Sequence, residues 1–491
     1  MAMGTRRRRQ RQEQIWISHD EVAKGPGHPF YKKVNELLEE AKFDDFAEKE
    51  CAKFYAANNG RPSVTPGIYF RLLLLGYFEG IDSERGIAWR AGDSLGLREF
   101  LGIGLDEQPA DHSTISRTRR LIDVETHKKV FSWILEVLRE RGLIKGKTVG
   151  IDATTLEANA AMRSIVRRDS GESYEEFLTG LAKESGIETP TREDLTRIDK
   201  NRKNKASNKD WVNPHERDAR IAKMKDGSTH LAHKAEHAVD METGAVLAVT
   251  LQEADQGDTA TVQETLLQAG ENVAELLVTE TEKAPEEKRP VYFQGVKEVV
   301  TDKGYHSSAV LVDIKDMEVR TYIPEKKQTL QRDWDGQKNQ TKARAQQEAT
   351  YANRRRVGGA YGKSLLRKRG ELVERSFAHC YETGGMRRTH LRGQKNILKR
   401  LLIHVGAFNL SLIFRSMLGA GKPRELKNRH ALVSFLLLWV IRWFPETQEP
   451  KILHFSIRRP SPQQNCRYLR YRLRHSNERS SATGCYLPVL R

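Results

Sequence analysis

The sequence predicts a protein of mixed α+β structure, in which an all-α region precedes a mixed β-sheet with flanking helices. In residues 13 to about 145, apolar side chains recur at the three- and four-residue intervals typical of helices. From residue 146 the pattern changes to the alternation of strands, and later strands alternate with helical stretches. This order predicts a sheet whose first strands are antiparallel and whose later strands are added through helical crossovers.

The composition limits the classes of protein to consider. The 491 residues are enough for roughly two to four domains, each with its own core. The four cysteines form no C-x-x-C pair, so neither a disulfide framework nor a zinc site is predicted. The first residues, MAMGTRRRRQRQEQIW, lack the apolar segment of a secretory signal, and the longest apolar run, at 431–441, is shorter than the roughly 18 residues of a membrane span. We expect a cytoplasmic protein with no membrane partner.

The charge balance predicts a polyanionic partner. Lysine and arginine number 83 against 66 acidic residues, which gives a formal net charge of +17. Nucleic acid is the commonest partner of such a protein, because each neutralised phosphate releases counterions. The alternative is a solvated basic surface without a specific partner.

A helical domain is predicted for residues 1–145. Its clearest helical segments are FYKKVNELLEEAKF, TPGIYFRLLLLGYFEG and ETHKKVFSWILEVLRERG. Between the last two, PADHSTISRTRRLI offers Asp111 or Ser113 as a helix cap. The basic residues Arg117, Arg119 and Arg120 follow, as in the second helix of a helix-turn-helix, although an ordinary basic surface helix fits the same pattern.

A second domain is predicted for residues 146–420, beginning with a strand in KGKTVGIDATTLEANA. A charged insert at about 163–210 contains NRKNKASNKDW, which we interpret as an exposed loop or hairpin able to touch phosphates. The runs THLAHKAEHAVD and GAVLAVTLQEA, joined by METG, then predict a hairpin.

The rest of this domain alternates helices and strands. A helix after Asp258, a strand in VKEVV, a helix in SSAVLVDIKDM and a strand in EVRTYIPEK follow one another. Residues 326–369 carry 13 Lys or Arg against three acids, and we expect a basic, mobile segment there. Helices are predicted again in GELVERSF and in NILKRLLIHVGAFNLSLIFRSML. The basic tail, 421–491, has no clear periodicity and could be a frame-altered end of an inactive copy.

Two carboxylates stand out from this pattern. Asp302 ends the strand in VKEVVTDKGYHSS, where a simple turn, with Gly304 at positive φ, is one interpretation. Asp152 interrupts the apolar strand TVGIDATTLEA, and a lone acid in a buried strand is costly unless it is paired or binds a metal. If the two strands are neighbours, the acids meet and a hard cation is needed to offset their repulsion. Magnesium and two-metal phosphoryl transfer fit such a site, with a third acid on a nearby helix.

These segments resemble the insertion-sequence transposases of the DDE type, which have a ribonuclease H-like catalytic core. The resemblance covers roughly residues 30–420 and rests on TPGIYFRLLLLGYFEG, GIDATTLEANAA, NPHERDARIAKMKDGSTHLAHKAEHAVD, TDKGYHS, and ELVERSF followed by GGMRRTHLRG. It implies that Asp152, Asp302 and Glu374 hold two Mg²⁺ ions, with Mn²⁺ as a possible substitute. Glu374 is preferred to Glu371 because Val373 and Phe377 are expected to pack against the sheet, which leaves Glu371 nearer solvent.

The resemblance also implies a double-stranded DNA partner, consisting of terminal inverted repeats and target. One departure concerns the Lys that often lies seven residues after the Glu, because this sequence has Tyr381 there. The expected DNA contacts outside the helical domain are Lys303, Arg369, Arg387, Arg388 and Arg392. The implied enzyme cleaves the element ends and joins the 3′-hydroxyl to target DNA, as a homodimer or larger complex. A nuclease without strand transfer and an inactive DNA-binding protein are the alternatives.

Overall fold

The computed structural model describes residues 28–56, 63–202, 207–224, 227–283, 295–326, 334 and 339–427, without the side chains of 277–283. The amino-terminal residues 1–27 and the basic tail from residue 428 lie outside the described residues. So do 203–206 of the NRKNKASNKDW stretch and most of 327–338.

The amino-terminal region is helical, as predicted. Its helices begin at residues that suit helix starts, because the side chains of Ser83, Ser94, Asp111 and Asp123 each accept a hydrogen bond from a backbone N–H of the first turn. Asp111, rather than Ser113, is the cap of its helix. The α-helices of this region are α1 (Pro29–Glu40), α2 (Phe43–Cys51), α3 (Pro66–Glu79), α4 (Glu84–Asp93), α5 (Leu95–Leu101), α6 (His112–Leu121) and α7 (Val124–Glu140).

The main sheet has the order β4-β5-β1-β7-β8, and β6 also pairs with β5. The strands β4, β5, β1 and β6 pair antiparallel, whereas β7 and β8 are added in parallel. The predicted hairpin and the predicted change from antiparallel to parallel pairing are both confirmed. The bounds of the strands are β1 (Thr148–Glu157), β4 (Arg220–Lys223), β5 (Thr229–Asp240), β6 (Val246–Glu253), β7 (Glu298–Val300) and β8 (Arg320–Tyr322).

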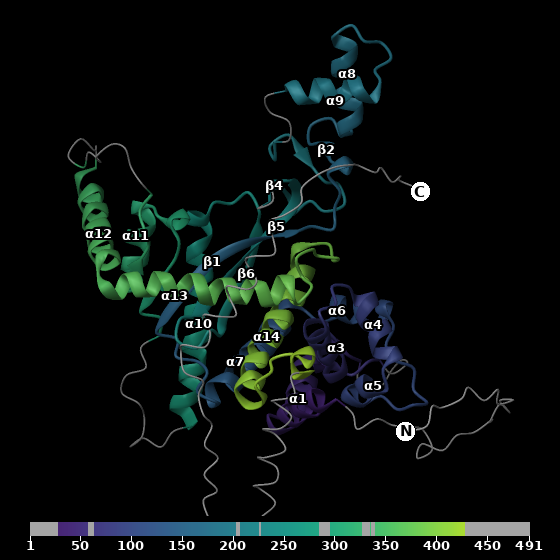
Figure 1. The fold of residues 1–491 in the computed structure, drawn as a ribbon, viewed down its shortest axis with the longest axis vertical. Coiled ribbons are helices and arrows are strands. Elements are labelled where there is room, and N and C mark those ends of the chain that lie inside the picture. Colours follow the sequence, from purple (N-terminus) through teal and green to yellow (C-terminus); the bar gives the residue numbers. More distant parts are fainter. Residues whose placement is uncertain are drawn as a thin grey trace, which may run out of the picture. The chain divides into compact units, whose positions relative to one another are not determined.

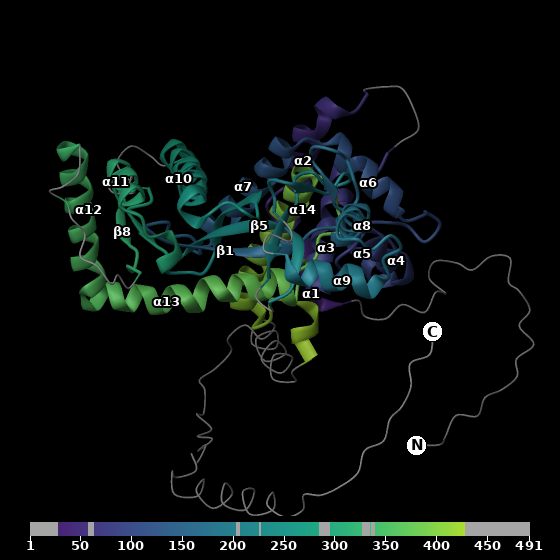
Figure 2. The ribbon, with the colours of Figure 1, turned by 90° about the horizontal axis from the view of Figure 1, so that it is seen from above.

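Helices lie on both faces of this sheet. Figure 2 shows α10 (Asp258–Lys283) on one face and α13 (Ala360–Phe377) on the other. The helix α13 crosses the strands, while α11 (Ser308–Asp316) and α12 (Gln340–Gly358) lie beside β8 (Figure 1). One face of β1 and β5 is therefore covered by α10 and the other by α13.

The long helix α14 (Gln394–Leu418) joins the helical region to the sheet. It packs against α3, α7 and β6, so one hydrophobic core extends through both regions. The stretch Gln394–Leu426 is long and apolar enough for a membrane span, but 72% of its apolar window is buried inside the protein. Its apolar character is explained by its position as a core helix.

Two expectations about the polar segments were wrong. The insert, expected to be an exposed loop or hairpin around NRKNKASNKDW, folds into α8 (Tyr174–Glu184), α9 (Arg192–Asn201) and a small sheet of β2 (Val166–Arg167) and β3 (Trp211–Val212), with 203–206 outside the described residues. The buried Trp211 is the centre of this unit, where the rings of Tyr174 and Phe177 pack edge-on against it and the Arg167 guanidinium lies over it. A few aromatic residues are enough to build a small core, although they give no periodic signal.

The second wrong expectation is the mobile segment at 326–369. From residue 340 onward it forms α12 and the first half of α13. The residues that α12 buries are small or polar, such as Ala343, Ala349 and Asn353, so it lacks an apolar stripe. Asn353 attaches α12 to the sheet edge because its side chain bonds both the N–H and the C=O of Ile323.

Candidate active site

Asp152 and Asp302 lie on adjacent parallel strands. The pairing of β1 with β7 runs from Thr148 opposite Glu298 to Gly150 opposite Val300, a separation of 150 residues in the sequence. Continued two residues past the last pair, the same separation brings Asp302, just beyond the end of β7, near Asp152. Because alternate residues of a strand point to one face, Asp152 shares the α13 face with Gly150.

Asp152 is bonded to an arginine of α13. Arg369 donates from Nη1 to Asp152 Oδ2 over 2.7 Å, and only 24% of the Asp152 side chain is exposed. Burial raises the pKa of Asp152, the guanidinium of Arg369 opposes this shift, and the nearby Asp302 adds to it. The negative charge of Asp302 is therefore close enough to raise the pKa of Asp152.

Asp302 both ends the strand and caps a turn. Its carboxylate accepts a hydrogen bond from the backbone N–H of Gly304 over 2.7 Å, at the start of a 3₁₀ turn, Lys303–Tyr305. The alternative of a simple turn with Gly304 at positive φ is not what the structure shows. Glycine is needed for space instead, because a Cβ there would lie 2.5 Å from Asp258 Oδ2 and 2.9 Å from Asp302 Oδ1.

A buried polar network supports this turn from the α10 side. Glu236, fully buried on β5, accepts hydrogen bonds from Thr261, Thr265 and the Tyr305 hydroxyl. Lys234 Nζ lies 3.2 Å from Glu236 and 2.7 Å from Asp258. Sequence reasoning missed both charged strand residues, although charged side chains inside THLAHKAEHAVD, a stretch otherwise apolar, were the available signal.

Glu374 lies on α13, one residue beyond the part of the helix that contacts β1. Val373 lies close to Gly150, and the Phe377 ring packs on His237 of β5, so both residues face the sheet as predicted. Leu372 approaches Gly244, at the turn beside the start of β1. Helix geometry places Glu374 about 160° around α13 from Leu372, so we expect it on the flank toward Asp152 and Asp302.

Glu371 points to solvent. Its carboxylate pairs with Arg375 on the same helix, and 66% of the side chain is exposed. Glu374 is exposed as well. Among the residues that the structure describes, no three Asp, Glu, His or Cys side chains are grouped closely enough to share a metal ion. The structure thus brings Asp152 and Asp302 together, with Glu374 on the adjacent flank of α13 and Arg369 at the Asp152 carboxylate.

The donor chemistry fits a hard divalent cation. The facing groups of the two strand acids are carboxylate oxygens, which Mg²⁺ prefers, and no thiol or imidazole ligand accompanies them in the described part of the chain. Binding of a cation between them would offset both their mutual repulsion and the burial that raises the pKa of Asp152.

Tyr381 occupies an interior position. It is fully buried, and its hydroxyl lies 2.6 Å from His237 Nε2. Burial lowers the pKa of His237 to about 3, so this imidazole is neutral. A lysine at this position would have to bury its charge, which explains the departure from the expected Lys.

The remaining basic residues differ in exposure. Lys303, Arg388 and Arg392 are exposed beside the site or beyond the end of β1. Arg387 is half-buried and donates from Nη1 to Thr154 Oγ1 and to the Thr155 carbonyl, so part of its guanidinium is used to hold β1. Arg369 contacts Asp152 rather than facing open solvent.

On α6, the three predicted DNA contacts do not share one environment. Arg117 and Arg120 are exposed, but Arg119 is 5% exposed and bonds Glu84 Oε1 over 2.6 Å. The expectation that Arg119 contacts DNA is corrected, because its guanidinium is committed to a buried ion pair. Residues 102–111 separate α5 from α6, a longer connection than the three- or four-residue turn of a helix-turn-helix.

This difference predicts two separable mutant phenotypes. Replacing Arg117 and Arg120 together with Ala should flatten the salt dependence of DNA binding by up to about 1.8 units, at roughly 0.9 per phosphate contact, without loss of stability. Arg119→Ala should instead lower the free energy of unfolding by about 3 kcal/mol, because it leaves Glu84 buried and unpaired. Fluorescence anisotropy across a salt series and urea denaturation measure the two effects. An unchanged salt slope in the double variant would show that α6 faces away from DNA.

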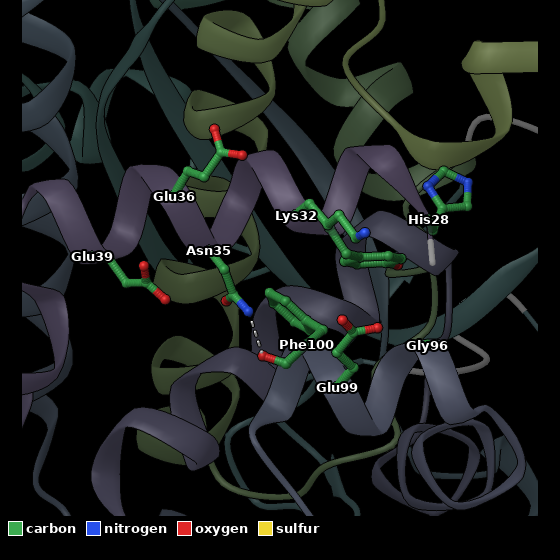
Figure 3. Close-up of a pocket in the computed structure, with 9 residues that line it drawn as sticks. His28, Lys32, Asn35, Glu36, Glu39, Gly96, Glu99 and Phe100 are labelled. Carbon is green, nitrogen blue, oxygen red and sulfur yellow. Dashed lines mark hydrogen bonds between the residues drawn. The ribbon is translucent and has the colours of Figure 1, made fainter. Parts of the chain in front are cut away.

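A cavity of about 270 Å³ lies between α1 and α5, in the helical region. Figure 3 shows Glu36, Glu39 and Glu99 around it, with Asn35 bonded to the Phe100 carbonyl. Its carboxylates would repel phosphate, so we do not assign it to a nucleic acid.

Two family models match the chain. Residues 18–121 match a Transposase domain (DUF772), and residues 208–410 match a Transposase DDE domain, which includes Asp302 and Glu374 but not Asp152. No curated protein and no solved structure matches it. The fold and these matches define a metal-dependent polynucleotidyl transferase that acts on DNA. More specifically, the chain belongs to the DDE transposases of insertion sequences.

Proposed function

We propose that the protein binds the terminal inverted repeats of its insertion sequence, cleaves the element ends and joins the freed 3′-hydroxyl to target DNA. The observation that supports this proposal is that Asp302, just past the end of β7, lies near Asp152 on the adjacent parallel strand β1. Glu374, expected on the flank of α13 nearer Asp152 and Asp302, is the proposed third ligand. Lys303, Arg388 and Arg392 are proposed to contact the DNA backbone.

Two Mg²⁺ ions held by these acids would supply activation of the attacking oxygen and stabilisation of the leaving oxygen. The chain itself positions the ligands. The Gly304 N–H orients the Asp302 carboxylate, and the network around Glu236 holds the turn that follows it. Arg369 stabilises the Asp152 carboxylate, and we propose that it moves to a DNA phosphate when the cation binds.

The domain division at residue 145 and the location in the cytoplasm are also proposals. The core that α14 shares with both regions supports a rigid connection between DNA-binding helices and catalytic sheet. We further propose a homodimer or larger complex, since the two ends of an element must be cut and joined together.

Cleavage of DNA that carries the element's own inverted repeats tests the proposal. The purified protein is incubated with the paired ends, a target plasmid and Mg²⁺, with EDTA as the control, and products are mapped to the nucleotide. The expected result is metal-dependent cleavage at the repeat ends followed by covalent joining to the plasmid. Cleavage without joining would indicate the nuclease alternative, and binding without any cleavage would indicate an inactive DNA-binding protein.

A further inference from the structure

A second polar cavity, of about 280 Å³, lies beyond the carboxyl end of β1. Three segments far apart in the sequence form it, namely residues 159–164, 213–215 and 388–392. Each segment contributes a basic side chain to the lining, with Arg163 from the first, His215 from the second, and Arg388 and Arg392 from the third.

Asn213 connects two of these segments. Its side chain is 1% exposed and donates from Nδ2 to Ser164 Oγ over 2.9 Å. Its Oδ1 accepts hydrogen bonds from the backbone N–H groups of His215 and Glu216. One buried amide therefore holds the walls that present Arg163 and His215.

The third segment is attached by its backbone. Both carboxylate oxygens of Glu216, which is 2% exposed, accept from the N–H of Gly393, at 2.9 and 3.0 Å. Glu157, at the end of β1, pairs through its own backbone with Arg387 and Thr389. The backbone that carries Arg388 and Arg392 is thus held in place before any ligand binds, which reduces the entropy cost of binding.

The charge of the cavity is positive. Glu157 opposes the three arginines from one side, with its Oε1 3.7 Å from Arg388 Nε, while the carboxylates of Glu216 and Asp218 are occupied by backbone N–H groups of Gly393 and Gln394. Arg392 Nε donates a hydrogen bond to the carbonyl oxygen of Asn159. A guanidinium can donate two parallel N–H hydrogen bonds to two oxygens of one phosphate, so arginine side chains suit a phosphate ligand.

We propose that this cavity binds a backbone phosphodiester of the DNA substrate, at a fixed distance from the cleavage site. The proposal rests on the proposed function and deepens it. The extended chain from Asp152 to Glu157 spans about 17 Å at roughly 3.3 Å per residue. If the duplex axis runs along β1, about 3.4 Å of helix axis per nucleotide places the bound phosphate roughly five nucleotides from the scissile bond.

The first test removes two of the cations. We compare the full-length double variant Arg163→Ala, Arg392→Ala with a control of equal charge change, Arg192→Ala, Arg197→Ala, on the exposed surface of α9. Binding to an inverted-repeat duplex is measured without metal across a salt series. The cavity variant should lose up to about 1.8 units of salt slope, whereas the control keeps the wild-type slope. Equal slopes in the two variants would overturn the proposal.

The second test changes the DNA instead of the protein, and compares the wild type with the cavity variant. Single neutral methylphosphonate linkages are placed along the duplex, and the position is counted from the mapped cut. Neutralising the linkage about five nucleotides from the cut should weaken wild-type binding but leave the cavity variant unaffected. An equal loss for both proteins would place that phosphate elsewhere.

The two proposals fail in different ways. If the protein binds the duplex but never cuts it, the proposed catalysis fails, while the salt-slope comparison still decides the cavity. If it cuts the duplex and the cavity variant matches the control, only the phosphate site fails.

Discussion

Replacing Asp302 with Asn should abolish cleavage of the element ends while leaving DNA binding close to wild type. The substitution removes the negative charge of a proposed metal ligand but retains an oxygen that can accept from the Gly304 N–H, so the turn keeps its shape. Loss of several kcal/mol of transition-state stabilisation corresponds to a rate decrease of about three orders of magnitude or more.

Cleavage of labelled repeat DNA measures the expected loss of activity, and fluorescence anisotropy measures the expected unchanged DNA binding. Asp316→Asn, an exposed acid at the end of α11, is the matched control and should cleave normally. Asp152→Asn should reproduce the loss, because its carboxylate lies beside Asp302. Cleavage by the Asp302 variant at the control's rate would contradict the assignment of this acid as a metal ligand.

Glu374→Gln should eliminate strand transfer, whereas Glu371→Gln should keep most of it. The two residues are three apart on α13, but only Glu374 lies on the flank toward the paired acids. Glu371 points to solvent and pairs with Arg375, an exposed contact worth at most a few tenths of a kcal/mol. Each variant therefore serves as the control for the other.

Joining of pre-cut ends to a plasmid measures strand transfer separately from cleavage. Thermal unfolding of both variants should match the wild type, since neither carboxylate is buried. If Glu371→Gln were the inactive variant, the helix would have to present the opposite flank to the DNA.

Much of the fold could be predicted from the sequence because the signal is local. The hairpin of β5 and β6 follows from two strand-like runs around METG, and its turn contains Gly244 at positive φ. The helix α14 follows from its apolar periodicity, although the structure buries it on nearly all sides. Where a helix buries alanine and asparagine, as α12 does, the local signal disappears and prediction failed.

The paired acids were also visible in the sequence, since a lone carboxylate in an apolar strand requires compensation. The sequence alone could not say what supports them. Lys234 and Glu236 face α10 because of the register of β5, and Gly304 is required by the position of Asp258 on another element. Such constraints come from contacts between distant segments.

By itself, the sequence determined most of the order of helices and strands, the excess of positive charge and the candidate acids, because periodicity and residue chemistry are properties of short segments. The tertiary structure decided which charged groups are available. Arg119 and Tyr381 are buried, Arg369 is bonded to Asp152, and Arg163 meets Arg392 in one cavity. Burial and proximity depend on how distant segments pack, and residue type alone does not specify them.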